Sequence, residues 1–316
     1  MQIQDMNNRL ELLFRAFMIG HGYREISAVP ISSKVDRSVR LVGSAFSRLR
    51  SCLVSDAFSV FTVQRAVRTQ ILSAYYEETA EQEFCSYHVS YGAIVDAGNA
   101  GKLAADCIEL VTQALGFAQQ ELRIRASSKD AVFLGNLRSS TLGECLILDS
   151  EDDERYQHQY GGSLYGRGFK VDCRQSSKFK NIVHVVAIFD REKGDQCVGA
   201  ELALTNASVL LRLFGLSYAV EVMPVSELLP CDSFAQRRYA DSLTVVTHLL
   251  YEGVRPNSSR MDGRLLRRYL KALHYFGDVL EICEQTRIKH ITEYARLEYQ
   301  DDRLLDVNLA PIINNF

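Results

Sequence analysis

The segment 237–277 most constrains what this chain can fold into, because it has the pattern of two amphipathic helices joined by a short loop. The apolar residues of its first half share one helical stripe, at i, i+4, i+7 and i+11: Tyr239, Leu243, Val246 and Leu250. Gly253 and Pro256 end this first helix. A second helix is predicted after Gly263, so the segment should form a helical hairpin.

The second helix also carries a basic stripe. Its members recur at i, i+3, i+4 and i+7 on one face: Arg264, Arg267, Arg268 and Lys271. One interpretation is a solvated edge of the hairpin. The other is a surface that binds the phosphates of tRNA or another RNA, to which Asn257 in the preceding loop would also belong. The pattern leaves both interpretations open.

The totals limit the classes of protein to which the chain can belong. With 36 basic and 39 acidic residues there is no overall field to recruit nucleic acid, so any such site must be a local patch. The 8 cysteines form no CxxC pair, which argues against a zinc site and predicts no metal centre. Reduced thiols, no signal peptide and no apolar run near the roughly 18 residues of a membrane span predict a cytoplasmic protein without a membrane partner.

Four pieces of the hairpin occur in a recognisable order: Ala240-Asp241, Glu252-Gly253-Val254, Pro256-Asn257-Ser258 and the run 263–268. They resemble A-D-H, D-G-V, P-S-N and R-G-Y-V-L-R-R in the helical segment that follows the catalytic core of alanyl-tRNA synthetases. Ser242 stands where that family has its histidine. The resemblance extends upstream to about residue 7 and suggests what several other segments do.

Residues 58–70 alternate as a half-buried strand should. Pattern alone indicates a strand with a salt-bridged arginine. The run Gln64-Arg65-x-Val67-Arg68 also resembles motif 2 of the family, S-Q-R-C-V-R, whose last arginine binds the ATP α-phosphate and the substrate carboxylate. The resemblance therefore implies that Arg68 is catalytic and ATP-binding, since a guanidinium fork can hold two anions at once.

The run 83–92 resembles the family's return strand, and Ser90-Tyr91-Gly92 matches its end. Glu83 lies one place from the family glutamate that contacts the adenine end of ATP, so the resemblance implies an ATP-binding role for Glu83. Either the strand slips by one residue, which would exchange its two faces, or that contact is lost. His88 on this strand is either functional or an ordinary polar strand residue.

Residues 205–213 occupy the place of the family's motif 3, D-T-G-M-G-L-E-R. Arg212 matches the arginine that contacts the γ-phosphate. Thr205 replaces the aspartate that holds the substrate ammonium, and Ala207 and Val209 replace two glycines, where a Cβ should narrow the floor under ATP. In the predicted strand 180–191, Asn181 corresponds to an asparagine of the amino-acid pocket, so Asn181 and Thr205 are the expected substrate-binding pair.

The remaining elements are expected from local pattern. They are helices over 7–21 and 99–116, an extended segment over 26–31, strands over 120–125 and 196–204, a polar loop over 151–159, and a mobile glycine-rich loop over 161–168. The first helix and the extended segment resemble the first class II motif, which in those enzymes builds the dimer interface or braces the sheet. A homodimer is therefore an expectation of the resemblance.

Together these matches imply an α+β fold: a class II synthetase-like antiparallel sheet flanked by helices over residues 1–234, and a small helical domain over 235–316. They imply an ATP-dependent, Mg²⁺-using ligase that activates an amino acid or other carboxylic acid as an acyl-adenylate. Because the chain ends where the family continues into further tRNA-binding and editing parts, a non-tRNA acceptor such as a small molecule or carrier is expected. A catalytically silent paralogue and a tRNA- or RNA-binding protein remain alternatives, and the acid and the acceptor stay unidentified.

Overall fold

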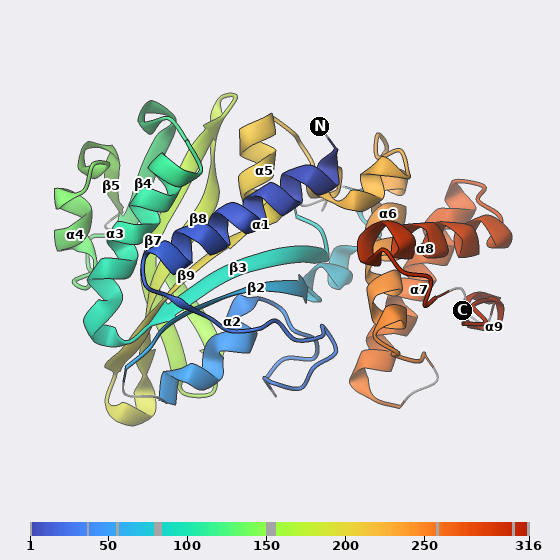
Figure 1. Cartoon of the computed structure of the whole chain (residues 1–316), viewed down its shortest axis with the longest axis horizontal. Coiled ribbons are helices and arrows are strands. Elements are labelled where there is room, and N and C mark those ends of the chain that lie inside the picture. Colours follow the sequence, from blue (N-terminus) through green and yellow to red (C-terminus); the bar gives the residue numbers. More distant parts are fainter. Residues whose placement is uncertain are drawn as a thin grey trace.

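The computed structural model describes residues 2–36, 38–54, 57–78, 84–149, 156–256, 259–304 and 307–314. In this part of the chain a nine-stranded sheet has the order β1-β2-β3-β9-β8-β7-β4-β5, with β6 paired to β7 (Figure 1). The strands are β1 (Arg24–Glu25), β2 (Ser59–Val67), β3 (Tyr87–Val95), β4 (Leu122–Ser127), β5 (Leu146–Asp149), β6 (Gln157–Gly161), β7 (Leu164–Gln175), β8 (Lys178–Asp190) and β9 (Gln196–Thr205).

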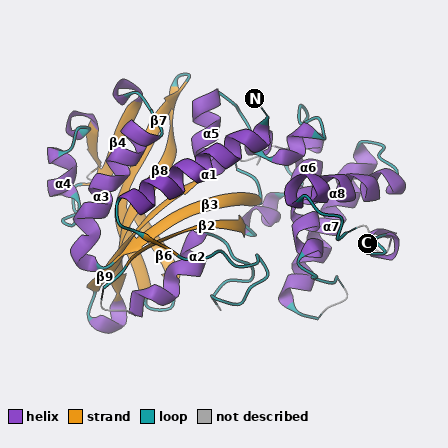
Figure 2. Ribbon diagram, in the orientation of Figure 1, coloured by secondary structure: helices purple, strands orange, loops and turns teal. Residues whose placement is uncertain are grey.

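Helices flank the sheet and continue beyond it on one side (Figure 2). They are α1 (Ile3–Gly20), α2 (Ala45–Leu49), α3 (Ala100–Glu109), α4 (Leu134–Ser139), α5 (Asn206–Phe214), α6 (Phe234–Tyr251), α7 (Met261–Val279), α8 (Glu284–Tyr299) and α9 (Ala310–Asn314). The expected α+β architecture, a sheet flanked by helices, is confirmed. In the described chain, no helix is long and apolar enough to cross a membrane.

The sheet is mixed rather than wholly antiparallel, which corrects the sequence-based expectation. The pairs β1–β2 and β4–β5, at the two ends of the strand order, are parallel, while the central pairs are antiparallel. Parallel neighbours need a crossover, and the segments carrying α2 and α4 supply those connections. The motif resemblance covers β2, β3 and β8 of the antiparallel centre, together with the end of β9.

Opposite faces of the sheet are covered by different helices. On one face α1 buries Leu10, Phe14 and Met18, and the Phe14 ring lies edge-on to Phe61 of β2 and Tyr91 of β3. On the other face α2 packs on β2 and β3. This second face keeps an open area beside α2, and the candidate functional residues lie there.

The close approach of α2 explains the glycine in Ser90-Tyr91-Gly92. A Cβ placed on Gly92 would lie 2.5 Å from the Cβ of Ala45, so a larger residue would push α2 off the sheet. The neighbouring Ser90 hydroxyl accepts a hydrogen bond from the Ala45 N–H at 3.0 Å. Both contacts fix the start of α2, which forms one wall of the site.

The glycine-rich segment 161–168 is not a mobile loop. Gly161 and Gly162, both with positive φ, form the turn between β6 and β7, and the rest belongs to β7. A Cβ on Gly168 would lie 1.8 Å from the carbonyl oxygen of Val185, so glycine here allows β7 and β8 to approach. The predicted polar loop 151–159 also differs, because Gln157 onward is strand β6 and 151–155 lie outside the described residues.

Two other local predictions need smaller corrections. The extended segment 26–31 is irregular, and the short strand β1 precedes it at Arg24–Glu25. The helix expected over 99–116 is α-helical only to Glu109, continues as a wider π-helical turn over Leu110–Ala114, and ends at Gly116 with φ +74°. The helices predicted over 7–21 and the hairpin 237–277 are confirmed as α1 and as α6 with α7.

The pieces of the hairpin that suggested a family have structural roles. The buried Asp241 carboxylate of α6 accepts hydrogen bonds from Ser86 Oγ at 2.7 Å, Ser86 N at 2.9 Å and Tyr75 Oη at 2.7 Å. Glu252 accepts from the N–H groups of Ile31 and Ser32. These contacts join the helical region to the sheet and to the N-terminal segment. The division into two domains at 234/235 stays a prediction.

Candidate functional site

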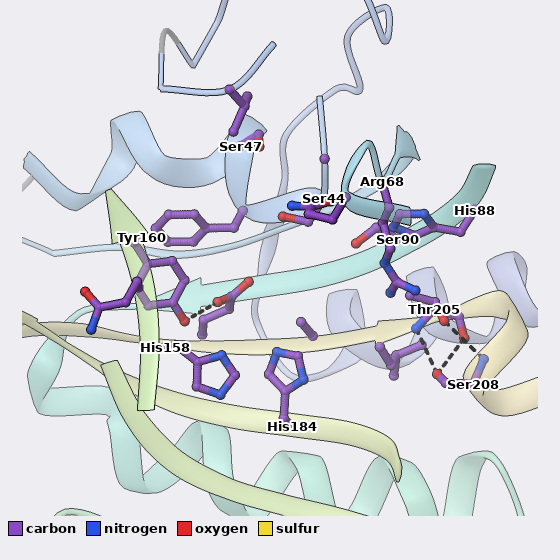
Figure 3. Close-up of a pocket in the computed structure, with 18 of the residues that line it drawn as sticks. Ser44, Ser47, Arg68, His88, Ser90, His158, Tyr160, His184, Thr205 and Ser208 are labelled. Atoms are coloured by element: carbon purple, nitrogen blue, oxygen red, sulfur yellow. Dashed lines mark hydrogen bonds between the residues drawn. The ribbon is translucent and has the colours of Figure 1, made fainter. Parts of the chain in front are cut away.

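A cavity of about 430 Å³ lies on the sheet face that carries α2 (Figure 3). Its floor is formed by alternate residues of β9, namely Glu201, Ala203 and Thr205, because every second side chain of a strand points to the same face. Strands β3, β6 and β8, helix α2 and the segment before α2 form the walls. A second cavity of about 230 Å³ adjoins it at the end of β9.

Arg68 lies at the junction of the two cavities and lines both. It follows β2 directly, and its N–H donates to the Ser86 carbonyl at 2.8 Å, which fixes the backbone. Its guanidinium lies over the Phe84 ring at 5.0 Å. Burial lowers the pKa of Arg68, and no carboxylate of the described residues forms an ion pair with it. An anion bound here would therefore meet a desolvated cation with a fixed backbone.

The sequence-predicted residues Arg68, Asn181, Thr205 and Arg212 all line the second cavity. They come from four elements: the end of β2, strand β8, the end of β9 and helix α5. Arg68, Asn181 and Thr205 also line the larger cavity. The structure thus brings together four positions that are 144 residues apart at their extremes, from 68 to 212.

Thr205 and Asn181 both hold the local backbone. The Thr205 Oγ1 accepts from the Ser208 N–H at 3.1 Å, and Ser208 Oγ accepts from the Thr205 N–H at 3.0 Å, so the pair forms the capping box that starts α5. Asn181 Nδ2 donates to the carbonyls of Val171 and Val183, where the β7–β8 register shifts.

The two residues that the sequence resemblance aligns with motif 3 glycines differ in their surroundings. Ala207 lines the second cavity, as expected for a Cβ that narrows its floor. Val209 is fully buried in the core and lines neither cavity, so the expectation that its side chain narrows this space is wrong. Because α5 turns Val209 towards the core, only one of the two replacements changes the shape of the site.

The other predicted binding residues lie elsewhere. Glu83 and Asn257 fall outside the described residues. Arg264 and Arg268 are exposed on α7 and line neither cavity. Arg267, between them on the same helix, is half-buried, and its guanidinium donates to the Pro256 carbonyl. The exposed basic stripe is therefore narrower than the sequence suggested.

Sequence reasoning missed the far end of the larger cavity. Glu201, Tyr160, His158 and His184 line the larger cavity but not the second one, which places them away from Arg212. Glu201 is only 3% exposed, and Tyr160 Oη donates to its Oε2 at 2.5 Å, a bond drawn as a dashed line in Figure 3. The available signal was a lone acidic residue within the apolar run 197–204.

Burial controls the protonation of this end of the cavity. Desolvation raises the pKa of Glu201 to about 7, against the opposing effect of the Tyr160 hydrogen bond. Desolvation lowers the pKa of His158 to about 4 and that of His184 to about 3, and the charge of Lys170 adds to both effects. Both imidazoles are therefore neutral at pH 7. His88, beside Arg68, is neutral for the same reason, with the charge of Arg68 contributing.

An arginine on the opposite side fixes the wall of the cavity. Arg50 donates to the carbonyls of Tyr160 at 2.6 Å and Gly161 at 2.9 Å and to Ser38 Oγ at 3.0 Å. Its guanidinium also lies 3.7 Å from Asp36. It therefore ties the β6–β7 turn to the segment before α2, and both of these segments contribute to the wall of the cavity.

The salt-bridged arginine that the alternation of β2 predicted is Arg65. Its Nη2 lies 2.9 Å from Glu298 of α8, and its side chain faces away from the cavity. The two arginines of the Gln64–Arg68 run thus have different surroundings. Arg65 lies on the face of the sheet turned away from α2, while Arg68 reaches the cavity.

The residues present fit a polyphosphate better than a protein-held metal. Three basic residues line the second cavity: Arg68, Lys180 and Arg212. Several basic side chains around one small cavity suit the negatively charged oxygens of phosphates. In the described ranges no group of three His, Cys, Asp or Glu residues could hold a metal ion. The described side chains therefore do not form a site for Mg²⁺ of their own.

No protein-family model matches the chain, and no curated protein matches it. Among solved structures it is similar to aminoacyl-tRNA synthetases. Part of a threonyl-tRNA synthetase from Cryptosporidium parvum, described as its RNA-binding domain, is 9% identical, with 68% of this chain and 64% of that chain covered and a TM-score of 0.45. The pyrrolysyl-tRNA synthetase PylSc of Desulfitobacterium hafniense is 10% identical, with 67% and 70% covered and a TM-score of 0.41.

The histidyl-tRNA synthetase of Staphylococcus aureus, without ligand, is 13% identical, with 87% of this chain and 85% of that chain covered and a TM-score of 0.39. At such identities and TM-scores the likeness says nothing about activity or substrate. The more specific resemblance to alanyl-tRNA synthetases stays a prediction from the sequence motifs.

Proposed function

We propose that this chain is an ATP-dependent ligase that activates a carboxylic or amino acid as an acyl-adenylate in the two adjoining cavities. The observation that carries the proposal is the position of Arg68, which lines both cavities and has no carboxylate partner among the described residues. A cation at such a junction can contact an acid in one cavity and a phosphate in the other.

In the proposed step an oxygen of the acid attacks the α-phosphorus of ATP, the new P–O bond forms, and pyrophosphate leaves with the electrons of the broken bond. ATP, when bound, supplies the activated phosphorus. Arg68 would reduce the repulsion between the two anions through its fork of N–H donors. Arg212 would hold the phosphates that leave, since it lines the second cavity but not the first.

The test is pyrophosphate exchange with labelled ATP across a panel of acids. Exchange that depends on one class of acid supports the ligase, and its absence with every acid tried contradicts it. The acceptor of the acyl group would be sought only after exchange is seen. The cytoplasmic location and the homodimer remain expectations.

A catalytically silent paralogue is the second candidate, and the surroundings of Thr205 favour it. The Thr205 hydroxyl caps α5, and Ala207 adds a methyl group to the second cavity, so motif 3 has acquired features that stabilise the helix rather than bind a substrate. This candidate predicts that ATP neither binds nor protects the protein against thermal unfolding.

An RNA-binding role is the third candidate. Arg264, Arg268 and Lys271 are exposed along α7, and they lead to two exposed tyrosines, Tyr275 and Tyr76, whose rings lie 5.1 Å apart. Basic side chains track a phosphate backbone and aromatic rings stack on bases, so this surface has both components of a single-strand site. It lies on α7 and on the β2–β3 connection that carries Tyr76, and its residues line neither cavity.

A further inference from the structure

Glu201 has no part in the proposed activation step, although it is the carboxylate at the inner end of the larger cavity. It is buried, and its Oε2 accepts a 2.5 Å hydrogen bond from the Tyr160 hydroxyl. That length is typical of a hydroxyl bound to an ionised carboxylate. A buried carboxylate with a single hydroxyl partner is costly, because one neutral donor does not replace the water that burial removes.

Two imidazoles extend the acceptor-rich surface around Glu201. His158 and His184 both point into the cavity in Figure 3, and their ring centroids are 5.1 Å apart. Both are neutral at pH 7, so each has one nitrogen that accepts a hydrogen bond. Among the described residues that line this cavity, Arg68 is the one Lys or Arg, and it lies at the junction with the second cavity.

We propose that the acid activated at this site carries a protonated amine, which binds Glu201 while the carboxylate of the same molecule lies at Arg68. The amine would donate to Glu201 and to the acceptor nitrogens of His158 and His184. This inference rests on the proposed function for the position of the carboxylate. The position of the amine rests on the cavity itself.

The floor of the cavity sets the length of such an acid. Glu201 and Thr205 lie on the same face of β9, four residues apart, which is about 13 Å along a strand. Thr205 and Arg68 both line the junction with the second cavity, so the carboxylate held by Arg68 lies at this end of the floor. A hydrogen bond of about 3 Å at each end leaves roughly 7 Å between the carboxylate and the nitrogen. A straight ω-amino acid such as 6-aminohexanoate has about this span, and it has no α-amino group for Thr205 to hold.

The experiment compares two ligands by calorimetry: 6-aminohexanoate and hexanoate, which has the same chain without the amine. The wild type should bind the amino acid about 10- to 100-fold more tightly, as expected for one charge-assisted hydrogen bond. Glu201→Gln should remove this difference, whereas Glu192→Gln, at an exposed position outside the cavity, should keep it. Three results would overturn the proposal. The wild type could bind the two ligands equally, it could bind neither ligand, or the difference in affinity could survive in Glu201→Gln.

Tyr160→Phe provides a second variant if Glu201→Gln does not fold. It keeps the ring, whose centroid lies 4.2 Å from that of Phe46, and removes the hydroxyl that favours the ionised form of Glu201. Binding of 6-aminohexanoate should weaken several-fold while binding of hexanoate stays constant. Unchanged binding of both ligands, in a variant with a wild-type thermal midpoint, contradicts the assignment.

The pH dependence gives an independent readout. The affinity for 6-aminohexanoate should rise between about pH 6 and pH 8 as Glu201 ionises around its pKa of about 7, while that for hexanoate should not. The other titratable or charged groups that face this region are Tyr160, Asp36, Arg68, Lys170, His88, His158 and His184. The pKa values of the three histidines are lowered, so these residues titrate below this pH range. A flat affinity for 6-aminohexanoate across this range counts against Glu201 as its partner.

Pyrophosphate exchange separates this inference from the proposed function. Exchange supported equally by hexanoate and 6-aminohexanoate leaves the ligase standing and overturns the amine assignment. Tight, Glu201-dependent binding of 6-aminohexanoate without exchange for any acid supports the amine assignment and contradicts the ligase.

Discussion

The hydroxyl of Tyr160 lies 2.5 Å from Oε2 of Glu201, although their strands do not pair: β8 and β7 separate β9 from β6 in the sheet. The bond crosses the cavity face and joins the β6–β7 hairpin to the sheet floor. It therefore closes the inner end of the cavity and partly offsets the rise that burial causes in the pKa of Glu201. The first prediction concerns this pair.

Glu201→Gln should change how stability depends on pH. The pKa of Glu201 is raised from its ordinary 4.5 to about 7 in the folded state. Between these values the folded protein keeps a proton that the unfolded chain has lost, so this residue's contribution to stability falls as pH rises from about 4.5 to 7. The amide cannot ionise, so the variant should lose less stability over this range, by about 2–3 kcal/mol.

Urea unfolding at about pH 5 and pH 8 measures this difference, with Glu192→Gln as the exposed control. His158 and His184 act in the opposite sense, because their lowered pKa values reduce stability as pH falls below about 6.5, and they are present in every variant. An identical pH dependence in wild type and Glu201→Gln would mean that Glu201 is not desolvated.

Asp241→Ala should strongly destabilise the protein. The buried carboxylate accepts bonds from Ser86 and Tyr75, and its removal leaves these donors unsatisfied at the contact between α6 and the sheet. We expect a loss of about 3–5 kcal/mol in the free energy of unfolding, and about 1 kcal/mol for Ser86→Ala, which removes one hydroxyl. Asp232→Ala, at an exposed carboxylate before α6, should change it little. Similar values for the two aspartate variants would contradict the role assigned to Asp241.

Local pattern predicted the elements whose periodicity is strong and failed where a residue has two structural uses. The apolar stripe of 237–277 and the alternation of 58–70 gave α6, α7 and β2. The glycines of 161–168 were misinterpreted because a glycine can mark a loop or a close approach of strands, and Gly168 is the second case. The parallel edge pairs depend on neighbours distant in sequence, so no local pattern contains them.

The candidate site was predicted at one end only. Arg68, Asn181, Thr205 and Arg212 were found because each belongs to a short motif, and the fold places all four around one cavity. Glu201 and Tyr160 lie 41 residues apart on strands that are not neighbours, so their contact could not be read from spacing. Only the isolated charge of Glu201 within an apolar strand could have drawn attention to it.

The α7 surface predicts an effect on RNA binding. Replacing Arg264, Arg268 and Lys271 together by glutamine should weaken retention of tRNA at low salt and reduce the slope of log affinity against log salt by about 2, since each phosphate contact contributes roughly 0.7–0.9. Lys289→Gln, at an exposed lysine of α8, serves as control. If the wild type does not bind tRNA at low salt, the RNA-binding function is excluded.

The sequence resemblance aligns Thr205 with a family aspartate, and this alignment predicts the choice of acid. A hydroxyl that caps α5 offers no counter-charge to an α-ammonium group, so acids without a free α-amino group should support exchange at least as well as their α-amino counterparts. Exchange assays with L-alanine and propanoate, and with lysine and 6-aminohexanoate, make the comparison. A clear preference for the α-amino acid in both pairs would show that Thr205 has been aligned with the wrong motif position.

Arg68→Lys tests the central claim most directly. Lysine keeps the charge but loses the fork that can hold a phosphate and a carboxylate together, so adenylate formation should fall by about 2–4 kcal/mol in transition-state free energy, while the thermal midpoint should barely change. Arg65→Lys, at the salt-bridged arginine on the other face of the sheet, is the matched control and should retain exchange. The decisive measurement is pyrophosphate exchange by the wild type and both variants with the best acid of the panel. The ligase account predicts that the wild type and Arg65→Lys exchange pyrophosphate and that the exchange rate of Arg68→Lys is about 30- to 1,000-fold lower. Exchange by Arg68→Lys at the wild-type rate, or no exchange by the wild type with any acid, would contradict it.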